Sequence, residues 1–423
     1  MSDLSQQLIE QVKEAYQHQS PLFIQGNNSK AFLGRSVTSN QTDSPRASTL
    51  STAAHTGIIS YQPVELVMTA RAGTTLAELQ AALDEHQQML AFESPFFNGQ
   101  ATIAGTLAAN LSGPARPWAG SIRDAVLGTR LINGQGEHLR FGGQVMKNVA
   151  GYDLSRMQAG ALGTLGVITE VSFKVLPKPE STAYLQVEIP AQQAITLMNQ
   201  LAGQPKPITG ACWYQGKLQI RLSGAASAVD NTVTLWSQRH GLSINDQGAE
   251  FWHQLQHYQL PFFTDDASLW RFSVKSTAPL ETSLLPSEAL SSSLSASNSL
   301  SSKDLSSRAG GSEEPGSEKI NNPVDPDEHL LIDWCGNQRW LKTPSLSSTD
   351  QRHIQPQLQS TLQAQLQQQA ETAGGTVTLW RGGDRSLEVN HEPNPVLKRL
   401  QQNVKQAMDP TGIFNPGRLY SWM

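Results

Sequence analysis

The sequence is poor in cysteine and in charge, and both shortages exclude classes of protein. Among its 423 residues there are two cysteines, Cys212 and Cys335. Two cysteines cannot by themselves ligate an iron–sulfur cluster or build a disulfide framework, so we expect two buried, reduced thiols. Charged residues make up only 16% of the chain, whereas roughly 25% is ordinary. The net charge is −5, so the sequence has no basic footprint for binding nucleic acid.

Long apolar segments and two common nucleotide-binding motifs are also missing. No apolar run approaches the roughly 18 residues that a membrane-spanning helix needs, and the first residues lack the basic and apolar parts of a secretory signal peptide. We therefore expect a cytoplasmic protein. There is no G-x-x-x-x-G-K-[ST] segment. Residues 160–166 read G-x-x-G-x-x-G and precede an expected strand at 167–175, whereas a Rossmann loop follows a strand.

Glycine, by contrast, is concentrated between residues 95 and 177, in five turns that separate apolar runs. Glycine permits positive φ and lets backbone approach a ligand without an intervening Cβ. The segment Thr102–Gly105 precedes 106–111, a good helix former. We therefore expect free backbone N–H groups at a helix N-terminus, which is a ready anion site. A single such glycine commonly marks a simple turn, but five turns together favour a nucleotide phosphate cradle.

Hydrophobic periodicity predicts an α+β fold with two kinds of domain. Residues 1–180 alternate strands with short helices, including a hairpin whose strands lie at 126–132 and 137–141. Residues 181–390 show a β-α-β-β-α-like order, which is typical of an antiparallel sheet backed by helices. A Ser-rich stretch at 281–325 contains no aromatic residue, and we expect it to be a disordered insertion. Residues 391–423 form a separate C-terminal segment.

Several of these segments together resemble a known family. Residues 21–30, 99–114, 151–154 and 160–174 look like the FAD-binding domain of vanillyl-alcohol-oxidase flavoproteins, also called the p-cresol methylhydroxylase (PCMH) type. Within this family, 142–156 is the most specific piece, and it is similar to the FAD-binding E subunits of bacterial glycolate oxidases, or glycolate dehydrogenases. The resemblance is strong over 1–180, returns at 409–418 and is weak between them.

The resemblance implies a PCMH-type FAD-binding domain of two α/β subdomains, a cap domain, and a C-terminal segment that returns to the flavin. In some relatives a histidine in the first loop carries a covalent bond to FAD. Asn28 stands at that position here, so we expect non-covalent FAD. The residues that the resemblance assigns to the cofactor are Gly26, Asn27, Asn28, Ser29, Lys30, Thr102, Ile103, Ala104, Gly105, Thr106, Ser121, Asp124, Gly151, Tyr152, Asp153, Gly160, Gly163, Thr164, Gly166, Val167, Ile168 and Asn415.

The catalytic side departs from the family. Related 2-hydroxy-acid dehydrogenases carry an H-x-G-D-G-N-x-H segment that organises a metal and the substrate, but residues 378–385 contain no histidine pair here. His253 and His257 have helical spacing without an H-E-x-x-H pattern, so we expect no metal site. No catalytic residue is assigned. Arg381 and Arg385 are the candidates for binding a substrate carboxylate, because a guanidinium can do so through two parallel hydrogen bonds.

Three functional hypotheses follow from the resemblance. The first is an FAD-binding subunit of a complex that oxidises glycolate to glyoxylate, with a sister flavoprotein and an iron–sulfur subunit, attached to the cytoplasmic membrane at most peripherally through those partners. The second is a self-sufficient FAD-dependent dehydrogenase of 2-hydroxy acids, of the D-lactate type. The third is a scaffold that has lost its flavin. The intact glycine loops count against the third and the missing histidine pair counts against the second, so the first is favoured.

Overall fold

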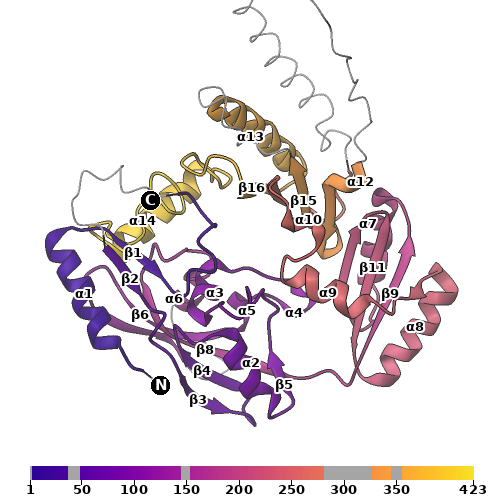
Figure 1. The fold of residues 1–423 in the computed structure, drawn as a ribbon, viewed down its shortest axis with the longest axis horizontal. Helices are drawn as coiled ribbons and strands as arrows, with labels where there is room; N and C mark the ends of the chain where they lie inside the picture. The colour runs from indigo at the N-terminus through magenta and orange to yellow at the C-terminus, as the bar shows by residue number, and fades with distance from the viewer. Residues whose placement is uncertain (1, 37–47, 144–152, 281–325, 344–354) are drawn as a thin grey trace, which may run out of the picture.

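The computed structural model describes residues 2–36, 48–143, 153–280, 326–343 and 355–423. The predictions for Gly151, Tyr152 and the Ser-rich stretch 281–325 lie outside the described residues. Figure 1 shows two lobes, the first formed mainly by the N-terminal half of the chain and joined by the C-terminal helix. In the described ranges no helix is both long enough and apolar enough to cross a membrane.

The first lobe is built on a six-stranded antiparallel sheet in the order β3-β4-β8-β6-β7, with β5 paired to β8. The predicted hairpin is confirmed, because β6 pairs with β7 around Asn133. The strands are β3 Ile58–Gln62, β4 Val67–Arg71, β5 Gln88–Leu90, β6 Val126–Ile132, β7 His138–Gly142 and β8 Val167–Pro177. The helices are α1 Ser5–His18, α2 Leu76–Asp84, α3 Ile103–Ala109, α4 Arg116–Ala119, α5 Ile122–Ala125 and α6 Leu154–Met157.

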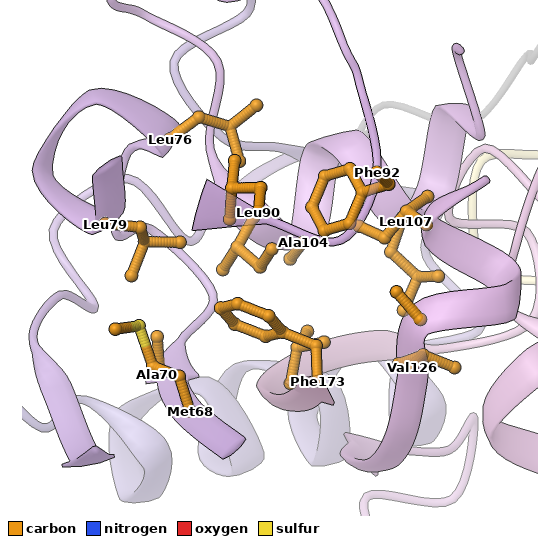
Figure 2. Close-up of a cluster of buried hydrophobic side chains, with 14 of the residues drawn as sticks. Met68, Ala70, Leu76, Leu79, Leu90, Phe92, Ala104, Leu107, Val126 and Phe173 are labelled. Carbon is orange, nitrogen blue, oxygen red and sulfur yellow. The ribbon is translucent and has the colours of Figure 1, made fainter. Parts of the chain in front are cut away.

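Helices α2 and α3 cover one face of this sheet and bury its core. Figure 2 shows Phe173 of β8 pointing toward Leu90 and Ala104, with Leu107 beside them. The rings of Phe173 and Phe92 meet edge to face with their centroids 6.3 Å apart. Burial of this apolar surface is the main force that fixes α3 on the sheet. The N-terminus of α3 is thereby held at a defined place at the edge of the lobe.

A short parallel pair of strands stands beside the sheet, β1 (Leu22–Gln25) with β2 (Ser48–Ser51). The C-terminal segment joins this pair, because Leu22 forms a parallel bridge with Phe414 and its N–H donates to Ile413 O at 2.7 Å. Helix α14 (Pro395–Met408) precedes that segment and lies against the first lobe (Figure 1). The C-terminal segment therefore lies against the first lobe, and its approach to the flavin stays a prediction.

The second lobe is an eight-stranded sheet in the order β12-β9-β11-β10-β14-β15-β13-β16. The expected β-α-β-β-α order is present as β9-α7-β10-β11-α8. The strands are β9 Ser181–Glu188, β10 Ile208–Tyr214, β11 Lys217–Gly224, β12 Ser243–Ile244, β13 Ser268–Ser273, β14 Leu330–Asp333, β15 Gln338–Thr343 and β16 Thr376–Arg381. The helices are α7 Ala191–Ala202, α8 Ala226–His240, α9 Gly248–Gln256, α10 Pro261–Thr264, α12 Pro326–His329, the 3₁₀ turn η3 Trp334–Gly336 and α13 Gln355–Thr372.

The two faces of the eight-stranded sheet have different neighbours. Helices α7, α8 and α13 pack on the outer face, where Trp213, Trp236 and Trp270 are fully buried. The inner face packs on α9, α10 and residues of the first lobe, including Leu33 and Leu111. Most of the lobe's tryptophans are therefore core residues.

An ion pair crosses between the lobes. Arg221 of β11 donates two hydrogen bonds to the carboxylate of Glu93, at 2.9 and 3.2 Å. Both side chains are about 15% exposed, so water screens the pair weakly. The indole N–H of Trp334 donates to Gly113 O at 3.0 Å and forms a second link. These contacts fix the inner face of the sheet above the loop that follows α3.

Candidate functional site

An open groove lies in the first lobe where β1, α3 and the C-terminal segment meet. The volume of the groove is about 200 Å³. Its walls come mainly from four stretches far apart in the sequence, namely 23–31, 102–109, 162–168 and 415–418. The predicted cofactor residues that line it are Gly26, Asn27, Asn28, Ser29, Lys30, Thr102, Ala104, Gly105, Gly163, Gly166, Ile168 and Asn415.

The loop that follows β1 supplies unused backbone donors. Asn28 has φ +60°, in the left-handed region, and the turn it makes places successive amides side by side. In the described ranges the N–H groups of Asn27, Asn28 and Ser29 donate to no other group. Successive backbone N–H groups in such a turn form a concave anion site.

Lys30 adds a positive charge to the same wall. Burial lowers the pKa of its ammonium group to about 8. Its Nζ donates to Ser29 Oγ at 3.4 Å and lies 5.2 Å from the centre of the Phe97 ring. No ion pair to a carboxylate joins it in the described part of the chain. A desolvated cation without a partner charge is stabilised by an anion that enters the groove.

The opposite wall, α3, corrects one prediction. The expected free N–H groups at its N-terminus are wrong, because each already has a partner: Ile103 N–H donates to Thr74 O at 2.9 Å, Ala104 N–H to Ala72 O at 3.2 Å, and Gly105 N–H to Thr102 Oγ1 at 3.2 Å. Gly105 instead leaves room for a ligand to approach the backbone of α3 closely. A Cβ there would lie 2.9 Å from Thr102 Oγ1 and 3.9 Å from Lys30 Nζ.

The floor of the groove is held by Asn415. Its Oδ1 accepts a hydrogen bond from Ile24 N–H at 2.8 Å, and its Nδ2 donates to Leu162 O at 2.7 Å. Gly163 follows with φ +74°, and a Cβ there would lie 2.7 Å from Asn415 Nδ2. Asn415 therefore joins β1, the loop after α6 and the C-terminal segment, and it holds these three walls of the groove in place.

Other predicted cofactor residues lie away from the groove and have structural partners. Ile103, Thr106, Thr164 and Val167 are buried, and Gly160 N–H donates to Leu107 O at 3.2 Å. These residues belong to the core and to the turns that hold α3 and β8. Binding of the cofactor by these five residues stays a prediction.

Three further predicted residues cap short helices. Asp124 Oδ2 accepts hydrogen bonds from both the backbone N–H and the hydroxyl of Ser121, each at 2.9 Å, at the start of α5. Asp153 Oδ1 accepts from Arg156 N–H at 3.0 Å at the start of α6. Capping satisfies helix N–H groups that would otherwise lack partners. A role for these three residues at the cofactor stays a prediction.

Sequence reasoning also missed part of the groove. Arg418 lies within the C-terminal motif, so its position could have been read from the same resemblance. Thr52 follows β2, and no sequence pattern could have placed it in the groove, because the parallel pairing of β1 with β2 is a tertiary contact. The missed lining residues are Phe23, Ile24, Gln25, Ala31, Thr52, Ala108, Ala109, Leu162 and Arg418.

The two candidate arginines are engaged in structural hydrogen bonds. Arg381 donates to Phe263 O and, at 2.6 Å, to Asp265 O. Arg385 donates from Nε and Nη2 to Gly34 O, at 2.9 and 2.7 Å. These bonds hold β16 to its neighbours and to the first lobe. Carboxylate binding by either arginine therefore stays an untested prediction that this geometry does not favour.

The histidines at helical spacing have other partners as well. His257 Nδ1 accepts a hydrogen bond from Phe96 N–H at 3.0 Å, and burial, together with His253, lowers the pKa of His257 to about 4. Within the described ranges no group of three or more His, Cys, Asp or Glu side chains is arranged to hold a metal ion.

Comparison with known proteins defines the class to which this groove belongs. Residues 4–142 match the family described as "FAD binding domain". A solved structure of p-cresol methylhydroxylase superposes with a TM-score of 0.65 at 15% identity, covering 99% of this chain and 87% of that one. Alkyldihydroxyacetonephosphate synthase gives 0.61 at 13% identity, covering 97% and 75%. These likenesses confirm the predicted α+β fold of PCMH-type flavoproteins.

The sequence relatives are more specific. The glycolate oxidase subunit GlcE of Escherichia coli (strain K12) is 41% identical over 419 residues, which is 99% of this chain and 98% of that protein. The chain belongs to this family of FAD-binding glycolate oxidase subunits. The glycolate oxidase subunit GlcD of Bacillus subtilis (strain 168) is 42% identical over 80 residues, 19% of this chain and 17% of its own.

Proposed function

We propose that this chain is the FAD-binding subunit of a complex that oxidises glycolate to glyoxylate, that it holds FAD non-covalently, and that partner subunits receive the electrons. The observation that carries the proposal is the groove, where three unused backbone donors and the Lys30 ammonium face the glycine of α3. The full-length likeness to a glycolate oxidase subunit supports the choice of glycolate.

The residues of the groove fit FAD. The amides of 27–29 and Lys30 would hold its diphosphate, and Gly105 would let that group approach α3 closely. Gly163 and Ile168 would line the remainder of the cofactor, on the floor fixed by Asn415. The bound flavin supplies a two-electron acceptor, and the protein supplies binding and orientation.

Non-covalent attachment rests on Asn28, which lines the groove and which, by the resemblance, stands at the position where relatives with linked flavin carry a histidine. A carboxamide is not a nucleophile that can form that bond. The partners that we infer are a sister flavoprotein and an iron–sulfur subunit, in a cytoplasmic assembly that touches the membrane at most peripherally. Within this chain both cysteines are buried, and burial raises the pKa of Cys335 to about 12, so neither is poised as a metal-binding thiolate.

The test begins with the purified full chain. Acid precipitation should release the yellow colour into the supernatant, and flavin fluorescence that stays with the denatured band on a gel would refute non-covalent binding. Glycolate and an artificial acceptor should then be added to the chain alone and to the chain co-expressed with its partners. We expect turnover only in the second case. Rapid bleaching of the isolated flavin by glycolate or D-lactate would instead identify a self-sufficient dehydrogenase.

A further inference from the structure

Arg271 is a charged residue in the middle of a buried strand. Along β13, Trp270 and Phe272 belong to the outer core under α13, while Leu269 packs on the inner face. Side chains alternate along a strand, so Arg271 lies on the inner face with Leu269. It pairs in register with Trp340 of β15 and Thr378 of β16. Its guanidinium therefore projects from the middle of the sheet toward the first lobe.

The charge of Arg271 has no opposite partner. Its guanidinium lies 5.1 Å from the centre of the Trp380 ring, and in the described ranges it makes neither a hydrogen bond nor an ion pair. Burial lowers the pKa of Arg271, and the ionisable groups that act on it are the Tyr258 hydroxyl and the Arg116 guanidinium, which is a second cation. Arg271 is half-buried and therefore only partly hydrated, so an anion that binds its guanidinium displaces little water.

Tyr258 lies against the same tryptophan ring as this cation. Its ring lies 5.2 Å from the Trp380 ring and 5.7 Å from the Trp340 ring, centre to centre. Its hydroxyl has no hydrogen-bond partner among the described residues, and burial raises its pKa, so it stays protonated as a donor. A guanidinium and a phenol with unused N–H and O–H groups together match the two oxygens of a carboxylate.

The other acids near this position are already engaged. The Glu93 carboxylate is bound by Arg221 in the pair that joins the lobes. Asp333 Oδ1 accepts a hydrogen bond from Trp334 N–H at 2.8 Å, and burial raises the pKa of Asp333 to about 7. Neither carboxyl group contacts Arg271, so the local excess of positive charge remains.

A continuous set of rings connects this cation to the groove. The Trp380 ring meets the Phe32 ring at 5.5 Å, and Phe32 meets Phe97 at 6.0 Å. The Phe97 ring is the one contacted by Lys30 in the wall of the groove. The two unneutralised cations, Lys30 and Arg271, thus stand on either side of one aromatic layer.

We propose that Arg271 and the Tyr258 hydroxyl form a carboxylate-binding site on the inner face of the sheet, and that its ligand is a small 2-hydroxy acid such as glycolate or the corresponding 2-oxo acid. The identity of the acid rests on the proposed function, whereas the existence of the site does not. This subunit would then bind a small carboxylate itself in addition to holding flavin.

The experiment measures glycolate binding to the full chain by calorimetry, with quenching of tryptophan fluorescence as a second signal. Glycolamide, the neutral isostere, serves as the control ligand. The variants are Arg271→Met, Arg271→Lys and Tyr258→Phe. Arg140→Met is the matched control, because Arg140 is also a strand residue but is exposed, so the loss of net charge is the same.

We expect the wild-type chain to bind glycolate and not glycolamide. Arg271→Met should weaken glycolate binding by about 30-fold or more, as for other truncated buried charge contacts. Arg271→Lys keeps the charge but cannot donate two parallel hydrogen bonds, so it should bind glycolate about tenfold more weakly. Tyr258→Phe should lose about three- to tenfold. Arg140→Met should bind like wild type. The Lys and Phe variants keep most of the packing, so they decide the question if Arg271→Met fails to fold.

Two results would overturn the site: equal glycolate affinity in wild type and the folded Arg271 variants, or equal binding of glycolate and glycolamide. Flavin content, measured on the same samples, separates the two proposals. Flavin uptake without glycolate binding would refute the site and leave the flavoprotein proposal standing. Glycolate binding that depends on Arg271, in a chain unable to take up flavin, would support the site and refute the flavoprotein proposal.

Discussion

Replacing Asp409 by asparagine tests how the C-terminal segment is held against the groove. The Asp409 side chain is fully buried. Its Oδ2 accepts hydrogen bonds from Lys405 Nζ at 2.6 Å and from Phe414 N–H at 2.8 Å, and its Oδ1 accepts from Ile413 N–H at 3.1 Å. Lys405 Nζ also donates to Thr164 O at 2.8 Å. One carboxylate thus fixes the turn between α14 and the bridge to β1.

The substitution would leave the Lys405 ammonium buried without its counter-ion and would put an amide N–H₂ among donors. Removing one partner of a buried ion pair lowers the free energy of unfolding by about 3–5 kcal/mol. With a urea m-value of about 3 kcal/mol/M, the unfolding midpoint should fall by about 1–1.7 M. Flavin content should fall as well, because Asn415 of the floor is displaced with Phe414.

The assay is urea unfolding followed by circular dichroism, with flavin absorbance per chain on the same preparations. Asp84→Asn is the control. Asp84 pairs with Lys178 at 2.7 Å, but 49% of its side chain is exposed, so its loss should cost about 1 kcal/mol or less. Equal midpoints for the two variants would refute the reasoning that burial makes the Asp409 pair matter.

Three further changes test other parts of the molecule. Gly105→Val should empty the flavin groove, since its Cβ would lie 2.9 Å from Thr102 Oγ1 and its branches would project toward the cofactor. Gly203→Val, on the exposed end of α7, is the control. Full flavin occupancy in Gly105→Val would show that α3 does not face the cofactor. Glu93→Gln should lower the free energy of unfolding by about 3 kcal/mol, because it breaks the buried pair with Arg221, and an unchanged urea midpoint would count against an energetic link between the lobes. The pKa of His257 is about 4 in the folded chain, against 6.5 for a free histidine, so the unfolded state takes up the proton first and stability should fall as pH drops from 6.5 to 4. His257→Asn, which keeps an acceptor for Phe96 N–H, should flatten that dependence of the melting temperature, whereas an identical slope in the variant would assign the effect to other groups.

Local rules in the sequence predicted local structure well. The Thr-x-x-Glu sequence at 75–78 is the pattern of a helix capping box. The structure forms this box, with Glu78 N–H donating to Thr75 Oγ1 at 3.2 Å and Thr75 N–H donating to Glu78 Oε2 at 2.8 Å. The order β9-α7-β10-β11-α8 is also as predicted, because helix and strand periods are properties of neighbouring residues. The loop at 26–30 could be placed in the groove through its resemblance to a known cofactor loop.

Tertiary contacts explain what the sequence could not show. The N–H groups of Ile103 and Ala104 are taken by carbonyls of Thr74 and Ala72, about one helix and a loop earlier in the chain. No local pattern reveals such partners. Arg381 and Arg385 flank a glycine pair and were candidates for binding a carboxylate, yet both guanidinium groups donate hydrogen bonds to backbone carbonyls. Arg271 was overlooked although it carried a signal, namely one charge within the apolar run Leu269–Phe272.

The bond between Ile24 N–H and Asn415 Oδ1 spans 391 positions of the sequence. During synthesis β1 is therefore made early and waits, with one edge open, until Phe414 and Asn415 emerge. A chain interrupted between α3 and this point has the first loop and α3 but lacks the Asn415 floor between them. Cofactor binding that needs this floor is therefore expected only after nearly the whole described chain has been synthesised and folded.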